Sequence, residues 1–395
     1  MSEFKIPKNV SLIISRLNDN GYRADIVGGC VRDIILSKEP DDFDITTSAK
    51  PEETERIFSD FKLLKNGIKH GTVTVIIDKE PYEITTYRFD GEYTDNRHPD
   101  RVTFTSNIDD DLSRRDFTVN AIAYNPKDKI TDLYGGREDI QKRIIRAVGD
   151  PVSRFSEDAL RIFRAIRFAS VLDFKIDAGT GKALFEKKES LLGVSAERLY
   201  TEWKKLISGK GAYRILREYS EIVAVVIPEL VNLVLPDEGS FDKASGELRE
   251  LSLFALSTDL PKDAFVTFSE RLKTDSLHKK RGGIILDNLS FPLSTYREIY
   301  SRLIAVGEYD ILFDIIKLKI LLGKEREESI SILSKMQREG VAYRIKDLKI
   351  NGDDLKMLGK RGVEIGLILN SLLNSVADGE IKNERDELLG KVKSL

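Results

Sequence analysis

The stretch that decides the fold is ADIVGGCVRDIILSKEPDDFDITT, residues 24–47. Its first four residues favour a short β-strand, which runs directly into Gly28 and Gly29. Because glycine carries no Cβ, backbone N–H groups at such a turn can approach a phosphate closely. Arg32 follows, and its planar guanidinium can bind two phosphate oxygens at once. The pattern predicts a phosphate-binding turn, although an ordinary strand-to-helix turn explains the two glycines about as well.

Two carboxylates lie near the end of the same stretch. Asp42 and Asp44 alternate with apolar residues, which is the period-2 pattern of a strand, so they should project from one face. Crowded carboxylates raise each other's pKa unless a cation lies between them. Mg²⁺ prefers carboxylate oxygens, and two such ions can serve in-line attack at phosphorus. A solvated strand face is the more common fate of an Asp-x-Asp pair, and Glu83 could add a third carboxylate from a neighbouring strand.

Two later segments combine acidic residues with arginines. In DLSRRDFTVNA, residues 111–121, the paired arginines could neutralise a triphosphate or hold a ribose. A surface cluster of salt bridges explains that segment better when it is taken alone. In EDALRIFRAIR, residues 157–167, helical spacing of three places Asp158 beside Arg161, and Arg164 and Arg167 follow one turn at a time. The simpler alternative is an ordinary ion-paired helix face, in which each pair stabilises the helix by about 0.2–0.5 kcal/mol.

The Asp158/Arg161 pair could also inspect a nucleobase. Aspartate accepts hydrogen bonds and arginine donates them. Cytosine and adenine each present an amino donor beside a ring-nitrogen acceptor, whereas guanine and uracil present the opposite order. A pair aimed at this edge would accept C and A, and it would leave buried groups unpaired against G and U.

Composition excludes several classes of protein. The 395 residues include 63 Lys and Arg against 66 Asp and Glu, for a net charge of −3, and 41% are apolar. A single cysteine, Cys30, excludes internal disulfides and cysteine-rich zinc sites, and three histidines argue against histidine-rich metallohydrolase chemistry. No apolar run approaches the ~20 residues of a membrane span, and residues 1–20 lack a secretory pattern, so we expect a cytoplasmic protein. The near-zero charge argues only weakly against a nucleic-acid partner, because a local basic patch suffices.

Hydrophobic periodicity changes near Pro151. Before it, short strand and helix patterns alternate, and a polar loop over 90–100 is expected to be mobile. The expected elements there are helices at 10–17 and 51–58 and strands at 24–27, 42–46, 71–78, 82–88 and 102–105. After it, successive amphipathic helices are expected, for example at 157–171, 196–207, 309–322 and 354–375.

Five motifs in this order resemble the class II tRNA nucleotidyltransferases (the CCA-adding enzymes) and their bacterial poly(A) polymerase relatives. They are G-G-x-V-R-D, D-x-D, E-x-T-T-x-R, D-L-x-R-R-D-F-T-x-N-A and E-D-x-x-R-x-x-R, and here they occupy 28–33, 42–44, 83–88, 111–121 and 157–164. Residues 132–139 also resemble the family's hinge-like element, 196–198 are weakly similar, and 348–355 look familial. Residues 210–340 show no likeness that can be aligned.

The resemblance implies an α+β fold. It consists of a nucleotidyltransferase head with a mixed β-sheet and helices, followed by an elongated all-helical neck, body and tail. The corresponding domains are the catalytic head at 1–150, a neck for base recognition at 151–210, and a body and a tail for tRNA binding at 211–335 and 336–395.

The resemblance also implies a reaction: addition of C, C and A to tRNA 3′ ends, from CTP and ATP, without a nucleic-acid template. The 3′-hydroxyl would attack the α-phosphate and release pyrophosphate, with Mg²⁺ as cofactor. Asp42 and Asp44 would be the catalytic metal ligands, supported by Glu83. The implied nucleotide-binding residues are Gly28, Gly29, Arg32, Arg115, Asp116, Asp158, Arg161, Arg164 and Arg167.

The implied macromolecular partner is the acceptor–TΨC arm of tRNA, held by A-form shape and phosphate contacts. The resemblance implies no membrane and no protein partner. Candidate basic positions are Lys142, Arg143, Arg146, Arg154, Lys204, Lys205, Lys210 and Arg214, each of which is individually more typical of a solvated side chain.

Rival interpretations remain open. A-adding enzymes share all these motifs, and poly(A) polymerases tend to carry a long basic C-terminal extension that is not seen here. CC-adding enzymes usually lack much of the loop at 90–100. A non-catalytic RNA-binding module would gain nothing from the two adjacent carboxylates, and a small-molecule nucleotidyltransferase would not need the helical half.

Overall fold

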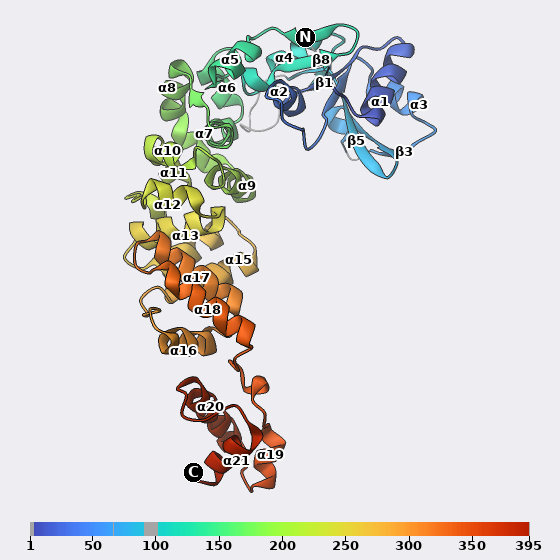
Figure 1. Cartoon of the computed structure of the whole chain (residues 1–395). Helices are drawn as coiled ribbons and strands as arrows, with labels where there is room; N and C mark the ends of the chain where they lie inside the picture. The colour runs from blue at the N-terminus through green and yellow to red at the C-terminus, as the bar shows by residue number, and fades with distance from the viewer. Residues whose placement is uncertain (1–3, 66, 91–101, 395) are drawn as a thin grey trace. The chain divides into compact units, whose positions relative to one another are not determined.

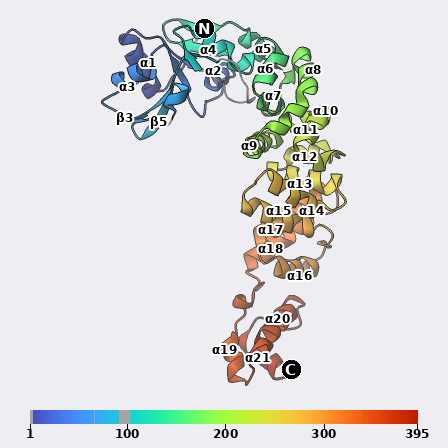
Figure 2. The same ribbon diagram turned by 180° about the vertical axis from the view of Figure 1, so that it is seen from behind.

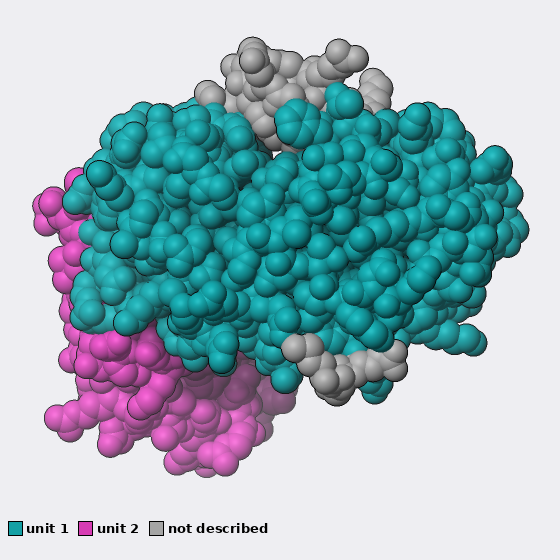
Figure 3. All heavy atoms as spheres, turned by 90° about the horizontal axis from the view of Figure 1, so that it is seen from above, with its two compact units in different colours: residues 1–228 teal, residues 229–395 magenta. Residues whose placement is uncertain are grey.

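A seven-stranded mixed β-sheet forms the core of the N-terminal half (Figure 1). The computed structural model describes residues 4–65, 67–90 and 102–394. Most of the loop expected at 90–100 therefore lies outside the described residues. The chain divides into two compact units, Met1–Pro228 and Glu229–Leu395 (Figure 3).

The sheet has the strand order β3-β4-β5-β2-β1-β8-β9. Strands β2 and β5 are parallel, and the other neighbours are antiparallel. This mixed sheet, followed by helices, confirms the predicted α+β class. The strands are β1 (Ala24–Val27), β2 (Ile45–Thr47), β3 (Lys62–Leu64), β4 (Thr72–Ile77), β5 (Glu80–Thr86), β8 (Ile122–Asn125) and β9 (Lys129–Asp132), and a separate ribbon pairs β6 (Arg88–Asp90) with β7 (Val102–Phe104).

Strand β1 lies inside the sheet and is buried along its whole length. Helices α1 and α3 lie side by side and cover part of the sheet (Figures 1 and 2). The expected strand at 42–46 is shifted: β2 (Ile45–Thr47) begins at Ile45, so Asp42 and Asp44 lie in the segment just before it rather than on the strand. The helices of this region are α1 (Lys8–Asp19), α2 (Gly29–Ile35), α3 (Pro51–Ile57), α4 (Ile108–Ser113) and α5 (Gly136–Lys142).

The first unit continues into helices without a break. Strand β10 (Ile144–Ile145) pairs in parallel with β11 (Lys175–Ile176), and α7 packs against α9 (Figure 2). The helix expected at 157–171 is in fact two helices, because the chain is extended at Asp158. The helices are α6 (Pro151–Glu157), α7 (Leu160–Leu172), α8 (Ala178–Lys187), α9 (Ala196–Ile207), α10 (Ala212–Glu218) and α11 (Ser220–Val226), with short 3₁₀ turns at 68–70, 118–120 (η2), 188–193 and 228–230. The four-domain division stays a prediction.

The second unit is helical, and its described residues divide between two apolar cores. One contains the packed rings of Phe254, Phe265 and Phe268, and the other is built on α20. The helix expected at 354–375 is wrong, because positive φ angles at Gly359 and Gly362 separate α19 from α20. The helices are α12 (Glu238–Lys243), α13 (Gly246–Ser257), α14 (Pro261–Arg271), α15 (Ser276–Asp287), α16 (Tyr296–Val306), α17 (Tyr309–Leu321), α18 (Glu327–Glu339), α19 (Gly352–Met357), α20 (Val363–Ala377) and α21 (Arg385–Lys393), with a 3₁₀ turn at 345–347.

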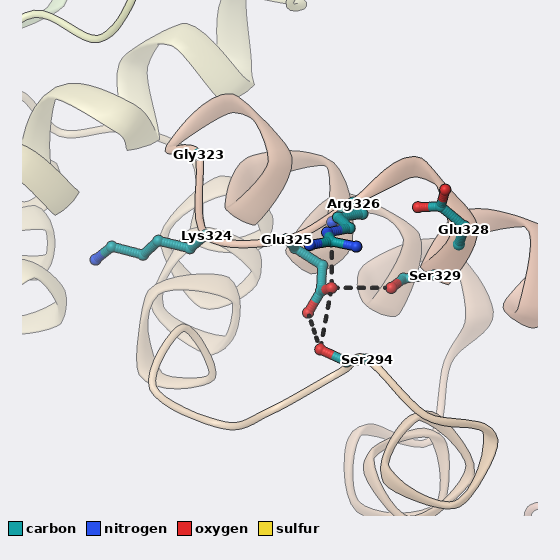
Figure 4. A pocket seen from close by; sticks show the side chains of 7 residues that line it. All are labelled: Ser294, Gly323, Lys324, Glu325, Arg326, Glu328 and Ser329. Carbon is teal, nitrogen blue, oxygen red and sulfur yellow. Dashed lines mark hydrogen bonds between the residues drawn. The ribbon is translucent and has the colours of Figure 1, made fainter.

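A hollow of about 660 Å³ opens in the second unit beside Glu325 (Figure 4). Ser329 Oγ and the Arg326 backbone N–H donate to Glu325 Oε1, each at 3.1 Å. Lys319, which is itself buried, places its Nζ 3.9 Å from Glu325 Oε2. This carboxylate is therefore neutralised by its own neighbours, and it ties α17 to the start of α18.

Among the described residues, no helix combines the length and the apolarity needed to cross a bilayer.

Candidate active site around the glycine turn and the arginine cleft

Three segments that are distant in sequence meet at Gly28. This residue has a φ of +82°, a conformation that L side chains rarely adopt. A Cβ built on it would lie 3.0 Å from Arg115 Nη1, and 3.8 Å from both Asp44 Oδ2 and the Asn120 backbone oxygen. The glycine turn is therefore required by its backbone conformation and by the close approach of its neighbours, and it brings the predicted phosphate-binding and acidic residues together.

Asp42 and Asp44 precede the inner strand β2, and Glu83 lies on the neighbouring strand β5. We call these three carboxylates the acidic edge. The Asp44 carbonyl accepts a hydrogen bond from the Val27 N–H at 3.0 Å, which holds this segment beside β1. Strands β2 and β5 pair in parallel with Ile45 opposite Ile84, so the preceding residues, Asp44 and Glu83, are neighbours as well. Desolvation raises the pKa of Asp44, and the charges of Asp42 and Glu83 raise it further, whereas Arg115 lowers it. The site thus concentrates negative charge that a cation would relieve.

These residues fit a hard divalent cation that retains water and phosphate ligands. Asp42 and Asp44 remain accessible to solvent and offer only oxygen atoms. Among the described residues, no three Asp, Glu, His or Cys side chains are close enough to enclose a metal ion. Two carboxylates with substrate oxygens and water completing the shell are typical of Mg²⁺ in nucleotide-dependent enzymes.

Asp111 anchors the paired arginines. Its side chain is fully buried in α4, and it accepts hydrogen bonds from Arg114 Nη2 at 2.6 Å and Arg115 Nη2 at 3.2 Å. Burial alone would raise the pKa of this carboxyl, but the two guanidinium groups hold it below its usual value. The charged anchor therefore fixes Arg115 beside the glycine turn.

A cleft of about 260 Å³ opens next to Arg115. Five arginines and two aspartates line it, so it presents a net positive charge to an anionic ligand. Its lining residues are Arg114, Arg115, Asp116, Asp158, Leu160, Arg161, Arg164 and Arg198. Arg115 belongs both to this cleft and to the surroundings of Gly28 and Asp44, so this one residue links the acidic residues to the predicted base-reading pair.

Asp158 and Arg161 are each held by a separate partner. Asp158 lies between α6 and α7, where its Oδ1 accepts from the Leu160 N–H at 3.1 Å and its Oδ2 accepts from Arg198 Nη2 at 2.8 Å. Arg161 Nη1 donates to Glu157 Oε2 at 2.5 Å. The predicted side-by-side helical spacing is therefore wrong, although both side chains line the cleft.

The other predicted nucleotide-binding arginines differ in position. Arg164 lines the cleft and donates to Asp116 Oδ2 from both Nε, at 2.9 Å, and Nη2, at 2.5 Å. Arg32 lies beneath Gly29, and Asp33 accepts from its Nε and Nη2 at 2.9 Å each. Arg167 is 7% exposed and lies in the interior beside α9.

Sequence reasoning missed the residues that hold this site in shape. They are Asp111, Asn120, Glu157, Arg198 and Glu202, of which Glu202 accepts from Arg167 Nε at 2.6 Å. Asp111, Asn120 and Glu157 fall within the quoted motifs, and residues 196–198 showed a weak likeness, so proximity to the motifs was the available signal.

Comparisons with known proteins identify the family of this chain. Residues 24–146 match the family described as "Poly A polymerase head domain", and residues 173–233 match "Probable RNA and SrmB- binding site of polymerase A". The chain is 36% identical to a CCA-adding enzyme of Pediococcus pentosaceus, over 97% of this chain and 96% of that protein. It is 35% identical to one from Lactobacillus delbrueckii subsp. bulgaricus, over 94% of each.

A solved structure also matches along its whole length. The Bacillus stearothermophilus CCA-adding enzyme in complex with CTP superposes with a TM-score of 0.77 at 30% identity, covering 98% of this chain and 97% of that one. With more than a third of its residues identical to those of a curated relative across nearly its full length, this chain belongs to the class II CCA-adding enzymes and is a tRNA nucleotidyltransferase.

Proposed function

We propose that this chain builds the whole CCA end of tRNA from CTP and ATP in one active site, without a nucleic-acid template and with Mg²⁺ as its cofactor. The observation that carries the proposal is the convergence at Gly28. Asp44 and Arg115 both approach this glycine, and Arg115 also lines the cleft that contains Asp158 and Arg161. Acidic groups for metal binding, positive charge for a triphosphate and a donor–acceptor pair for a base thus occupy one site.

Asp42 and Asp44 would hold the divalent ions, and Glu83 would reinforce the negative charge that attracts them. When bound, such ions lower the pKa of an attacking hydroxyl and neutralise a leaving pyrophosphate. The protein's own part is positioning: the residues around Gly28 align the α-phosphate with the tRNA 3′-hydroxyl, and no covalent enzyme intermediate is needed.

The triphosphate and ribose would bind along the glycine turn. Gly28 and Gly29 leave room for the phosphates, and Arg115, which Asp111 holds in place, supplies a fixed positive charge. Arg32 adds positive charge from beneath the turn, and Asp116 offers carboxylate oxygens for a ribose hydroxyl.

Asp158 and Arg161 would read the base. Asp158 accepts the amino hydrogen of cytosine or adenine, and Arg161 donates to the adjacent ring nitrogen. The bond to Arg198 leaves further lone pairs on Asp158. Arg161 Nη1 donates to Glu157 and to the Arg154 carbonyl, and its Nη2 donates to the Arg114 carbonyl, so the N–H groups left for a base are those on Nε and the second one on Nη2. Because both side chains are already fixed, little conformational entropy is lost when a nucleotide binds. Arg164 also lies at the cleft, whereas Arg167 would act indirectly, through the interior.

The helical part of the chain would hold the acceptor–TΨC arm by shape and phosphate contacts. Several basic candidates already form ion pairs within the protein, namely Lys142, Arg143, Arg146, Arg154 and Arg214. The exposed residues Lys204, Lys205 and Lys210 are therefore the better candidates for phosphate contacts in this region.

The experiment that tests this function uses three tRNA substrates, which end before CCA, after C and after CC. Each is incubated with the protein, Mg²⁺ and one labelled nucleotide at a time. We expect C to be added to the first two substrates and A to the third. Addition of A to the third substrate only would instead identify an A-adding enzyme, and continued addition of A would identify a poly(A) polymerase. If nothing is incorporated, the catalytic proposal is wrong.

A further inference from the structure

Asn120 joins two arginines that belong to different elements. It lies at the end of the 3₁₀ turn η2 and is 6% exposed. Its Oδ1 accepts a hydrogen bond from Arg32 Nη1 at 2.7 Å, and its Nδ2 donates to Asp116 Oδ1 at 3.2 Å. Asp116 Oδ2 in turn accepts from Arg164. A continuous hydrogen-bonded path therefore runs from Arg32 in α2 to Arg164 in α7.

The chemistry of the two ends requires an amide in the middle. An arginine only donates hydrogen bonds, and an ionised aspartate only accepts them. The group between them must accept on one side and donate on the other, which the two ends of an asparagine side chain do. This requirement also fixes the orientation of the amide, because the reverse orientation would place donor against donor and acceptor against acceptor.

Asp116 is ionised in this arrangement. Burial would raise the pKa of its carboxyl, but Arg164 and the Asn120 amide hold that pKa at about 2. The charged groups around the path are Arg32 and Asp33 from α2, Arg161 and Arg164 from α7, and Asp139 from α5, which accepts from Thr118 in the same turn as Asn120. The amide thus links two residues of the sheet-containing region, and the bonds from Arg164 to Asp116 extend the path to α7.

The path connects the two halves of the proposed nucleotide site. Arg32 lies 3.7 Å from the position of a Cβ on Gly29, and the Asn120 backbone oxygen lies 3.8 Å from that on Gly28. Arg164, at the other end, lines the cleft with Asp158 and Arg161. The ring of Phe168 supports both ends, because the Arg32 and Arg164 guanidinium carbons lie 5.5 Å and 5.3 Å from its centroid.

We propose that Asn120 is a positioning residue for nucleotide binding. It fixes the position of Arg32, next to the glycine turn, relative to Arg164, which lines the base-reading cleft. This inference rests on the proposed function of the two regions and adds the residue that couples them. Asn120 acts through Arg32 and Asp116 and touches no substrate itself. A purely packing role for this buried side chain would tolerate any residue of the same shape.

The test compares Asn120→Asp, which has nearly the same shape, with Asn120→Ala. The carboxylate of Asn120→Asp can still accept from Arg32, but it faces Asp116 with a second negative charge. Because Arg32 and Arg164 stabilise both negative charges, the new carboxylate stays ionised near neutral pH, and the donor to Asp116 is lost. Asn107→Asp is the matched control, since it makes the same substitution at an exposed helix cap in the same unit and preserves the capping oxygen.

Three quantities are measured for each variant relative to the unmodified protein: kcat, KM for CTP and KM for tRNA. We expect Asn120→Asp to lose about tenfold in kcat/KM for CTP, the loss of one hydrogen bond to a charged group. Asn120→Ala should raise KM for CTP about tenfold. KM for tRNA should be unchanged in both variants. Asn107→Asp should follow the unmodified protein.

The inference is overturned if folded Asn120→Asp keeps a normal kcat/KM for CTP, or if folded Asn120→Ala binds CTP normally. An equal rise in KM for CTP and KM for tRNA would show a general structural role and would overturn it too. Circular dichroism shows which variants are folded, and if Asn120→Asp does not fold, the ratio of the two KM values in Asn120→Ala decides the question. Asp42→Ala is assayed in parallel: full activity of that variant would refute the proposed function of the site, whereas its inactivity beside a fully active Asn120→Asp would refute the positioning role alone.

Discussion

Arg115 Nη1 lies 3.0 Å from the position that a Cβ on Gly28 would occupy. Arg115 is close to Asp44 and also lines the cleft, so its position matters to both. A Cβ at position 28 would require the Arg115 guanidinium, which Asp111 also holds, to shift by a few tenths of an ångström. The absence of a side chain at position 28 is therefore needed to keep Arg115 where it is.

Gly28→Ala should consequently impair activity far more than it impairs folding. With φ +82° and ψ −131°, Gly28 lies in a region open almost only to glycine, so strain in the variant costs about 1–3 kcal/mol of stability. The shift of Arg115 should reduce kcat/KM for CTP by about tenfold or more. Thermal unfolding and steady-state kinetics separate the two effects. Gly21→Ala is the matched control, because Gly21 has a φ of +85° and nothing within 4 Å of its Cβ position. Equal activity losses in the two variants would refute a special role for Gly28.

Asp42→Ala should abolish nucleotide addition while tRNA binding persists. The carboxylate belongs to the acidic edge, where Asp44 already has a raised pKa, and its removal halves the oxygen ligands proposed for the divalent ions. The measurement pairs incorporation of labelled CTP with a filter-binding assay for tRNA. Asp41→Ala, an exposed neighbour of the same charge, serves as the control and should remain active. Undiminished turnover by purified Asp42→Ala would disprove the metal assignment.

The sequence predicted the head well where local pattern and chemistry coincide. Strand β4 alternates buried and partly exposed residues and was expected at nearly its observed bounds. The glycine turn and the acidic pair each have a common alternative explanation, so they gain their meaning only from their order with the three later motifs. Strand β8 was missed because all four of its residues are buried, and a strand covered on both faces shows no alternation.

The break between α6 and α7 could not be read from local sequence. Ala159 and Leu160 favour helix, so periodicity extended one helix through Asp158. In the structure, Asp158 leaves the helical conformation and accepts from Arg198, forty residues later. Arg167 was equally unpredictable, since only its partner Glu202, supplied by α9, makes a buried arginine acceptable. The conformation at Asp158 and the burial of Arg167 thus both involve ion pairs with residues far away in the sequence.

Asp158→Ala and Arg161→Ala should loosen nucleotide choice more than they weaken tRNA binding. Each variant removes one member of the donor–acceptor pair, so GTP and UTP no longer leave both protein groups unpaired. We expect the preference for CTP over UTP to fall by about tenfold to a hundredfold, with KM for tRNA unchanged. Arg198→Ala should have a smaller effect in the same direction, because it only frees Asp158 to reorient.

The control for these variants is Arg16→Ala, which removes an arginine that is ion-paired with Asp60 in the same unit but lies outside the cleft. Competition between labelled CTP and excess UTP gives the preference directly. Strict selection of CTP and ATP by both Asp158→Ala and Arg161→Ala would mean that other residues read the base.

The second unit should lose stability at alkaline pH through His278. Its Nε2 lies 2.8 Å from Glu250 Oε2, whose side chain is buried. Burial lowers the pKa of His278, but the hydrogen bond to Glu250 and the charges of Glu250, Glu247 and Asp275 outweigh it, so the folded pKa lies above 6.5. The folded chain therefore binds this proton more tightly than the unfolded chain, and the stabilisation is present below about pH 6.5 and lost as the pH rises through the folded pKa.

Thermal unfolding tests this at pH 6 and pH 9. The difference in Tm between the two pH values should be smaller for His278→Gln than for the unmodified protein. His70→Gln, an exposed histidine in the first unit, should keep the full difference, and the same result for His278→Gln would show that this ion pair contributes nothing to the pH dependence.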